Sequence, residues 1–209
     1  IWTLAAASRL RGIFDAMEED EDPAPDLDEL LVLAAYDGDA QKLAGLIEQG
    51  ADRDATHDLG NPDGAARSAV WWACNKGHRN TFRLLVAKGA DFRAAADDGG
   101  TPFLAACMGC NLQIVRELKD LGADVHAADD DGWNAVLHGC AGGSTEVLRE
   151  LKAWGLDLHR TANDGWNAVL YAAMVGQLQA LRVLVGWEVD VHHTTNDGAN
   201  AAHIAAYFM

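Results

Sequence analysis

The feature that most constrains this chain is an internal repeat of 33 residues. One stretch, Asp131–Leu137, returns unchanged as Asp164–Leu170. Asp-Gly pairs recur at the same interval, at Asp98-Gly99, Asp131-Gly132, Asp164-Gly165 and Asp197-Gly198. A fixed period of this length predicts stacked supersecondary units, each of which contacts mainly its neighbours.

Each unit carries the signals of two short helices. An Asp-Gly turn precedes an alanine-rich segment, a small residue interrupts it, and a second segment has apolar residues at helical spacing. In one unit this stripe is Ile114, Val115, Leu118 and Leu121. The interruptions fall at Gly38, Gly77, Cys110, Gly143 and Gly176. Neither helix can bury its apolar face alone, so the predicted fold is an all-α stack.

At this point the chain resembles the ankyrin-repeat family. The period, the turn–helix–helix order and the segment Thr101–Ala106 match that pattern. The resemblance implies a solenoid of helix-turn-helix units joined by β-turn hairpin loops. It covers about residues 26–209, which we divide into five full repeats and a truncated sixth. The family's histidine at the start of the first helix is kept only at His203; the other units have Trp71, Leu104, Leu137 and Leu170.

Two segments depart from the period. Gly50 and Gly89 lie 39 residues apart, so six extra residues fall near 57–66, as a binding loop or as a tolerated loop extension. Residues 1–25 predict an amphipathic helix followed by an acidic, proline-containing linker. That helix either caps the first repeat or docks a partner. Because the sixth repeat stops after one helix, we expect the chain to continue, or a partner to cover this end.

The composition narrows the class of partner. The net charge is −16, from 32 acidic and 16 basic residues. Such a charge repels a phosphate backbone, so we expect no nucleic acid and favour a protein partner with a basic or aromatic-accepting surface. No apolar run reaches the length of a membrane span. Four cysteines in 209 residues favour a reducing intracellular compartment, with an organelle reached by a removed leader as the alternative.

Two columns of potential ligands have structural explanations. Cys74, Cys107 and Cys140 share one repeat position, where a cysteine fills a small buried slot. His126, His159 and His192 share a turn position, and stacked units lie too far apart for them to bind one metal. No motif selects a catalytic pair or a nucleotide loop. We therefore predict no catalytic, metal or cofactor site and no small-molecule substrate.

A third column lies on the second helices. Arg83, Arg116, Arg149 and Arg182 are spaced by 33 residues, on the side away from the apolar stripe. They predict a solvated surface with local partners such as Asp120 and Glu146. The alternative is a positive line that docks an acidic segment or a lipid headgroup.

The aromatic residues lead to the main functional hypothesis. Trp133 and Trp166 follow the Asp-Gly turn in the hairpin with which the family contacts its targets, and tryptophan is enriched at interface hot spots. The first-helix face, the concave side in ankyrin-like stacks, carries five more candidate protein-binding residues, Trp72, His138, Tyr171, Lys76 and Val175. The alternative is that Trp133 packs on the neighbouring hairpin beside Trp166.

Three functions remain open at this stage. The first is a non-enzymatic protein-interaction module that uses the hairpin tryptophans and the concave face. The second is a structural accessory subunit of a large membrane-associated complex, which could be organellar. The third is the regulatory ankyrin part of a longer enzyme. One local expectation concerns Glu188, which replaces a capping glycine and predicts that the last second helix ends early, near Gly186.

Overall fold

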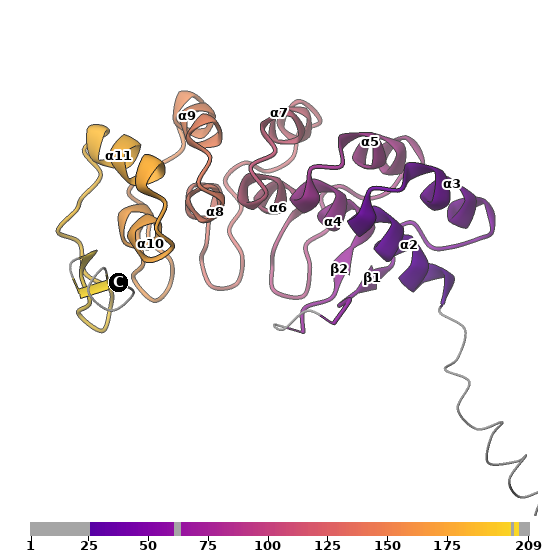
Figure 1. Cartoon of the computed structure of the whole chain (residues 1–209), viewed down its shortest axis with the longest axis horizontal. Helices are drawn as coiled ribbons and strands as arrows, with labels where there is room; N and C mark the ends of the chain where they lie inside the picture. Colours follow the sequence, from indigo (N-terminus) through magenta and orange to yellow (C-terminus); the bar gives the residue numbers. More distant parts are fainter. Residues whose placement is uncertain (1–25, 61–63, 202, 205–209) are drawn as a thin grey trace, which may run out of the picture.

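The computed structural model describes residues 26–60, 64–201 and 203–204, so the predicted N-terminal helix and linker lie outside the described residues. Within these ranges the chain forms a row of helix pairs (Figure 1). The pairs are α2 (Leu27–Asp37) with α3 (Ala40–Glu48), α4 (Ala69–Lys76) with α5 (Arg79–Ala87), α6 (Pro102–Met108) with α7 (Leu112–Asp120), α8 (Ala135–Gly142) with α9 (Thr145–Ala153), and α10 (Ala168–Met174) with α11 (Leu178–Gly186). The predicted all-α solenoid is confirmed.

Side-chain caps set the start of the first helices. Ser68 and Thr101 accept hydrogen bonds from the backbone N–H three residues ahead, at Trp71 and Leu104. Where asparagine replaces the family's threonine, the side-chain oxygens of Asn134 and Asn167 accept hydrogen bonds from backbone N–H groups of the first helical turn. A polar N-cap satisfies donors that the first turn leaves free. The substitutions therefore preserve the helix starts.

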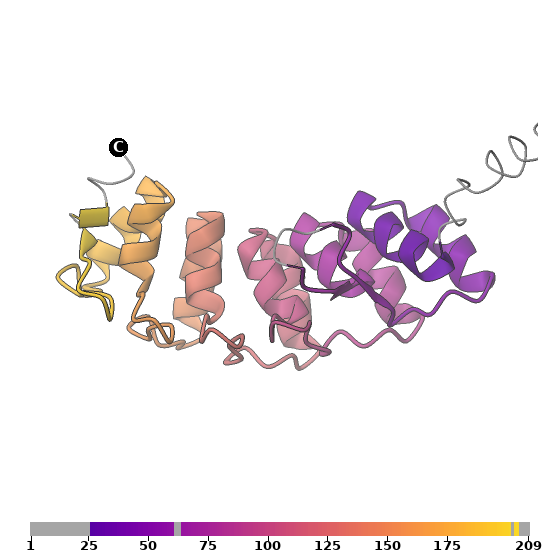
Figure 2. The ribbon, with the colours of Figure 1, turned by 90° about the horizontal axis from the view of Figure 1, so that it is seen from below.

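The hairpins line one side of the stack, below the helices in Figure 1 and along one edge of Figure 2. Backbone hydrogen bonds join them into a continuous row: Asp130 donates to Asp98, Asn163 to Asp131 and Asn196 to Asp164. The extra residues near 57–66 fall within the longest hairpin, whose strands β1 (Thr56–His57) and β2 (Arg67–Ser68) pair antiparallel. The irregular segment thus delivers Arg67 to the start of α4.

Stacking buries one continuous core. Phe82, Phe103, Leu104 and Leu137 are essentially inaccessible to solvent. Polar side chains at the start of the second helices add links between repeats: His78 Nε2 lies 3.0 Å from the Tyr36 carbonyl oxygen, and the Asn111 and Gln177 amides donate to the preceding repeat. These contacts link neighbouring repeats although the family's usual histidine is largely missing.

The arginine column differs from its expected surroundings. The sequence suggests local partners such as Asp120 and Glu146. Glu146 does interact electrostatically with Arg149. Arg83 and Arg116, however, pair with Glu117 and Glu150 of the following repeat. An arginine on a second helix can reach the second helix of the next repeat as well as residues of its own helix. Spacing within one helix does not show such contacts between repeats. Arg83 and Arg116 therefore each form an ion pair across the repeat boundary, and Arg83 shares Glu117 with Arg79.

The last second helix ends where expected, although this end is not early. The helix α11 ends at Gly186, which is the repeat position at which α5, α7 and α9 also end. Glu188 accepts the left-handed conformation, with a φ of 62°, that Gly89, Gly122 and Gly155 adopt in the other repeats. Stacking imposes the helix end, and Glu188 bears the backbone strain.

No helix among the described residues is long and apolar enough to cross a membrane.

Candidate functional site

The two hairpin tryptophans converge on one tyrosine. Trp133 and Tyr171 form an edge-to-face pair with ring centroids 4.3 Å apart, and Trp166 approaches the same tyrosine at 6.2 Å. His138 lies 6.1 Å from Trp133. All four side chains are half-buried. We call them the aromatic cluster; it joins repeats four and five, and part of its surface remains open to solvent.

The other predicted aromatic, Trp72, is nearly buried, although it lines a cavity beside α4. Its side chain is only 6% exposed and packs edge-to-face with Tyr36 and with Trp71. Lys76 is exposed and holds its ammonium group 4.3 Å above the Tyr36 ring and 5.8 Å from Trp72. A cation over an aromatic face is a stabilising contact. Trp72 and Lys76 thus form a second group, separate from the aromatic cluster.

Val175, the last predicted residue, follows α10 and is 38% exposed. It lies on the same side of the stack as the aromatic cluster, one turn after Tyr171. Two further large apolar side chains of this repeat, Leu178 and Val185, are 54% and 48% exposed. The last helix pair therefore presents more open apolar surface than the other described pairs.

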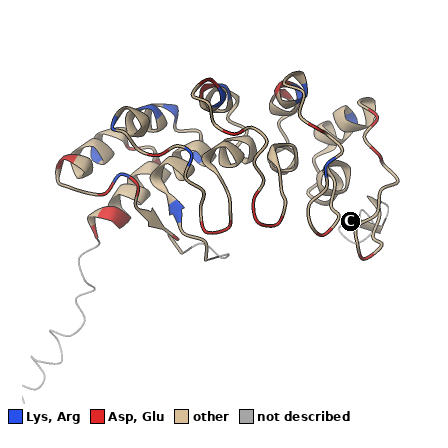
Figure 3. Ribbon diagram, turned by 180° about the vertical axis from the view of Figure 1, so that it is seen from behind, with Lys and Arg blue, Asp and Glu red and all other residues tan. Residues whose placement is uncertain are grey.

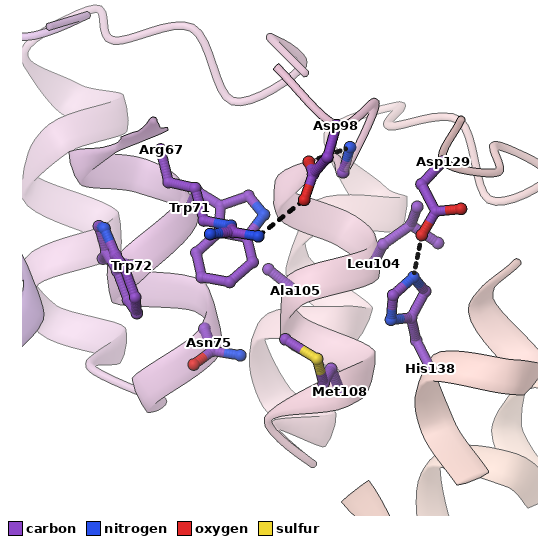
Figure 4. A pocket seen from close by; sticks show the side chains of 11 residues that line it. Arg67, Trp71, Trp72, Asn75, Asp98, Leu104, Ala105, Met108, Asp129 and His138 are labelled. Atoms are coloured by element: carbon purple, nitrogen blue, oxygen red, sulfur yellow. Dashed lines mark hydrogen bonds and ion pairs between the residues drawn. The ribbon is translucent and has the colours of Figure 1, made fainter. Parts of the chain in front are cut away.

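A cavity of about 350 Å³ opens between α4, α6 and α8 (Figure 4). Arg67 and Trp71 form one wall, and Asp129 and His138 form the opposite wall. The floor consists of small or apolar residues, with Gly100, Leu104, Ala105 and Met108. We call this cavity the repeat-three pocket; Trp72 and Asn75 of α4 also line it, and through His138 it adjoins the aromatic cluster.

Each wall of the pocket is held by a charged contact. Arg67 Nη2 donates to Asp98 Oδ2 over 2.7 Å, and its guanidinium lies 4.6 Å from the Trp71 ring. Across the pocket, His138 Nε2 lies 3.0 Å from Asp129 Oδ2. Figure 4 shows the two pairs facing each other across the floor. The arrangement fixes the width of the pocket.

Sequence reasoning missed three of these residues. Arg67 directly follows the irregular segment and lies 33 residues before Gly100, but its place in the repeat emerges only when these two positions are compared. Asp129 could have been identified from the sequence, since the equivalent positions of repeats three, five and six hold Ala96, Ala162 and Thr195, and an acid there signals a local role. Asp98 was noted only as a turn residue.

The cysteine column is buried as predicted. Cys74, Cys107 and Cys140 are fully inaccessible, and burial raises the pKa of the Cys140 thiol to about 12. Cys110 is half-buried and takes a left-handed conformation at the helix break. The column histidines are exposed, and each donates its backbone N–H to a turn aspartate two residues earlier. Among the described residues no group of three His, Cys, Asp or Glu side chains gathers as metal ligands would.

Comparisons with known proteins agree with this geometry. Residues 31–129 match the family model for ankyrin repeats in three copies. Over 91 residues the chain is 34% identical to an ankyrin repeat and KH domain-containing protein of Caenorhabditis briggsae. The aligned segment covers 44% of this chain and 3% of that protein. The chain thus spans a small fraction of that relative.

The match and the stacked helix pairs identify residues 31–129 as ankyrin repeats. Helix pairs of the same form continue beyond residue 129, through α11. Ankyrin repeats generally mediate protein–protein interaction, and as domains they are typically non-enzymatic.

Proposed function

We propose that this chain is a non-enzymatic protein-interaction module whose partner docks along the hairpins and the first-helix face. The observation that carries the proposal is the separation of charge. The helices α6, α8 and α10 contain no Asp, Glu, Lys or Arg. Acidic residues gather on the hairpins that border these helices, whereas basic residues lie mainly on the second helices (Figure 3). An uncharged face with an acidic border suits a polypeptide that is basic and partly apolar.

The predicted contact residues fit this proposal to different degrees. The aromatic cluster and Val175 offer apolar surface beside the acidic hairpins. Rigid aromatic side chains bind with little loss of conformational entropy, so Trp133 and Trp166 are suited to be anchors. Trp72 is buried and would support the surface from beneath, while Lys76 lies at its edge.

Charge reversal on two faces tests the proposal. The variant Asp97→Lys/Asp130→Lys changes exposed hairpin acids. The matched control, Glu48→Lys/Asp120→Lys, makes the same change of net charge at exposed positions of the second-helix layer. Cross-linking mass spectrometry of the tagged chain in native extract identifies the partner and the contacting lysines. We expect the hairpin variant to lose the partner and the control to retain it; equal capture by both would contradict the proposed face.

A second role, as an accessory subunit of a large assembly, is favoured by one observation. The exposed Val175, Leu178 and Val185 all belong to the last helix pair. Replacing Leu178 and Val185 by glutamine should release the chain from a large complex in native gels of whole extract. Migration of the unaltered chain at its own mass would refute this role.

A further inference from the structure

The repeat-three pocket occupies space that the chain itself fills in the next two repeats. The residue after the Asp-Gly turn is Trp133 in repeat four and Trp166 in repeat five, but Gly100 in repeat three. The first-helix residue beside it is His138 or Tyr171 in those repeats, but Ala105 in repeat three. Both bulky positions are thus occupied by small residues at one place in the stack.

The backbone does not require glycine at this position. Gly100 is absent from the residues with positive φ, and Asp98 Oδ1 accepts its N–H over 2.9 Å. Asp164 accepts the N–H of Trp166 in the same way, so a tryptophan is compatible with this turn. A Cβ on Gly100 would stand 2.8 Å from Asp98 Oδ1, so a larger residue requires a small shift of the Asp98 side chain, and the absence of such a residue leaves the pocket open.

The polar atoms of the pocket suit a particular occupant. The indole Nε1 of Trp71 is buried and has no hydrogen-bond partner among the described residues, and it lies 3.5 Å from the point where a Cβ on Gly100 would stand. A buried donor without an acceptor costs free energy. The side chain of Asp98 is 43% exposed at the rim and can accept a hydrogen bond. Asn75 and Trp72 also line the pocket, but Trp71 Nε1 and Asp98 are the polar groups nearest to the position that a side chain on Gly100 would take.

We propose that the repeat-three pocket binds an aromatic side chain, tyrosine above all, presented by a basic segment of the partner polypeptide. A phenol hydroxyl can accept from Trp71 and donate to Asp98, and its ring replaces the one that Trp133 supplies in repeat four. The floor includes Met108, whose sulfur contacts aromatic rings favourably. An arginine or lysine fits less well, because Asp98 and Asp129 are already paired and a cation would face the Trp71 donor.

The inference rests on the proposed function for the source of the side chain. Its first test, however, needs no partner. The probes are 4-methylphenol and indole, with ethylguanidine as the cationic comparison, added to the ¹⁵N-labelled chain while the indole N–H signals are recorded. We expect the aromatic probes to shift the Trp71 signal at millimolar concentration and ethylguanidine to leave it unchanged. Absence of a shift with both aromatic probes, or a shift with ethylguanidine alone, would overturn the proposal.

Filling the pocket from within provides the second test. Gly100→Trp restores the residue of repeats four and five, and Ala105→Tyr fills the same space from α6 if the first variant does not fold. Ala199→Trp makes the change at the equivalent position of repeat six, outside the pocket. We expect both filling variants to weaken probe binding at least tenfold and the control to leave it unaltered. Retained binding in a folded filling variant would refute the site. If the filling variants keep the partner that the hairpin charge variant loses, the pocket proposal fails and the proposed function stands.

Discussion

Arg116 in α7 and Glu150 in α9 form a two-pronged ion pair across adjacent repeats, with N–O distances of 2.9 and 2.8 Å. One repeat earlier Glu117 receives two arginines, Arg79 and Arg83, and is more enclosed by them. Exposed ion pairs contribute little because water screens them. We therefore expect Glu117→Gln to lower the free energy of unfolding by at most about 1 kcal/mol, and Glu150→Gln to have the smaller effect.

The contribution of Glu117 should depend on pH. Burial alone raises the pKa of its carboxyl, but the hydrogen bonds from Arg83 and Arg79 outweigh burial and lower that pKa below its ordinary value of 4.5. The stabilisation is then fully present above pH 4.5 and is lost as the pH falls through the lowered folded-state pKa. Urea unfolding at pH 7 and at pH 3 measures this. The difference between the original chain and Glu117→Gln should be smaller at pH 3 than at pH 7; a constant difference would contradict the assignment.

Replacing the hairpin tryptophans should reveal a structural role as well as a binding role. Trp133 meets Tyr171 at a centroid distance of 4.3 Å, closer than the 6.2 Å of Trp166. Loss of a half-buried ring and its aromatic contact costs about 2 kcal/mol. We expect Trp133→Ala to lower the free energy of unfolding by that amount and Trp166→Ala by less, as measured by urea unfolding. Equal losses would argue against Tyr171 as the shared partner.

The sequence predicts the repeating parts of this fold well and the irregular parts poorly. The period places the helix pairs, the hairpin turns and the buried cysteine slot, because each follows from spacing within a single unit. Contacts between units, such as Trp133 with Tyr171, depend on how far one hairpin reaches toward the next helix. Spacing alone left open whether the hairpin tryptophans pack or project, and the structure shows them half-buried.

The pocket was harder to foresee for a different reason. The pocket exists because Gly100 and Ala105 lack the large side chains found at the equivalent positions of repeats four and five. In the sequence taken alone, these are ordinary small residues. The wall residue Arg67 follows the six extra residues and holds the position of Gly100, Trp133 and Trp166, yet its side chain turns to Asp98 instead of an aromatic ring of the next repeat. The useful signal was the comparison of equivalent positions across repeats.

The buried thiols should be inert in the folded chain. Burial raises the pKa of Cys74 and Cys107, with Cys107 adding to the effect on Cys74, and raises that of Cys140 to about 12. Because the thiolate is the reactive species, we expect a thiol reagent at pH 8 to modify Cys110 slowly and the other three only on unfolding. Mass spectrometry after labelling with and without urea identifies the modified residues. Rapid labelling of Cys107 in the folded chain would disprove its burial.

A serine in the same slot tests the packing directly. Cys107→Ser keeps the size but buries a hydroxyl, which costs about 1–3 kcal/mol if it finds no partner. Cys107→Ala, which adds no polar group, should cost less. Free energies of unfolding in urea rank the two variants, and the opposite order would mean that the slot supplies a hydrogen bond to the hydroxyl.

Glu188 offers a site where the chain can be stabilised by removing a side chain. Its φ of 62° is the left-handed conformation that glycine adopts at the equivalent positions. An L-residue in this region costs about 1 kcal/mol, so Glu188→Gly should raise the free energy of unfolding by about that amount, reduced by the greater freedom of glycine in the unfolded chain. Gly155→Ala is the matched reverse change, because Gly155 has a φ of 80° and open space around it. It should destabilise the stack through its backbone alone. If Glu188→Gly destabilises the chain, the glutamate side chain must make a contact whose value exceeds the strain of its backbone.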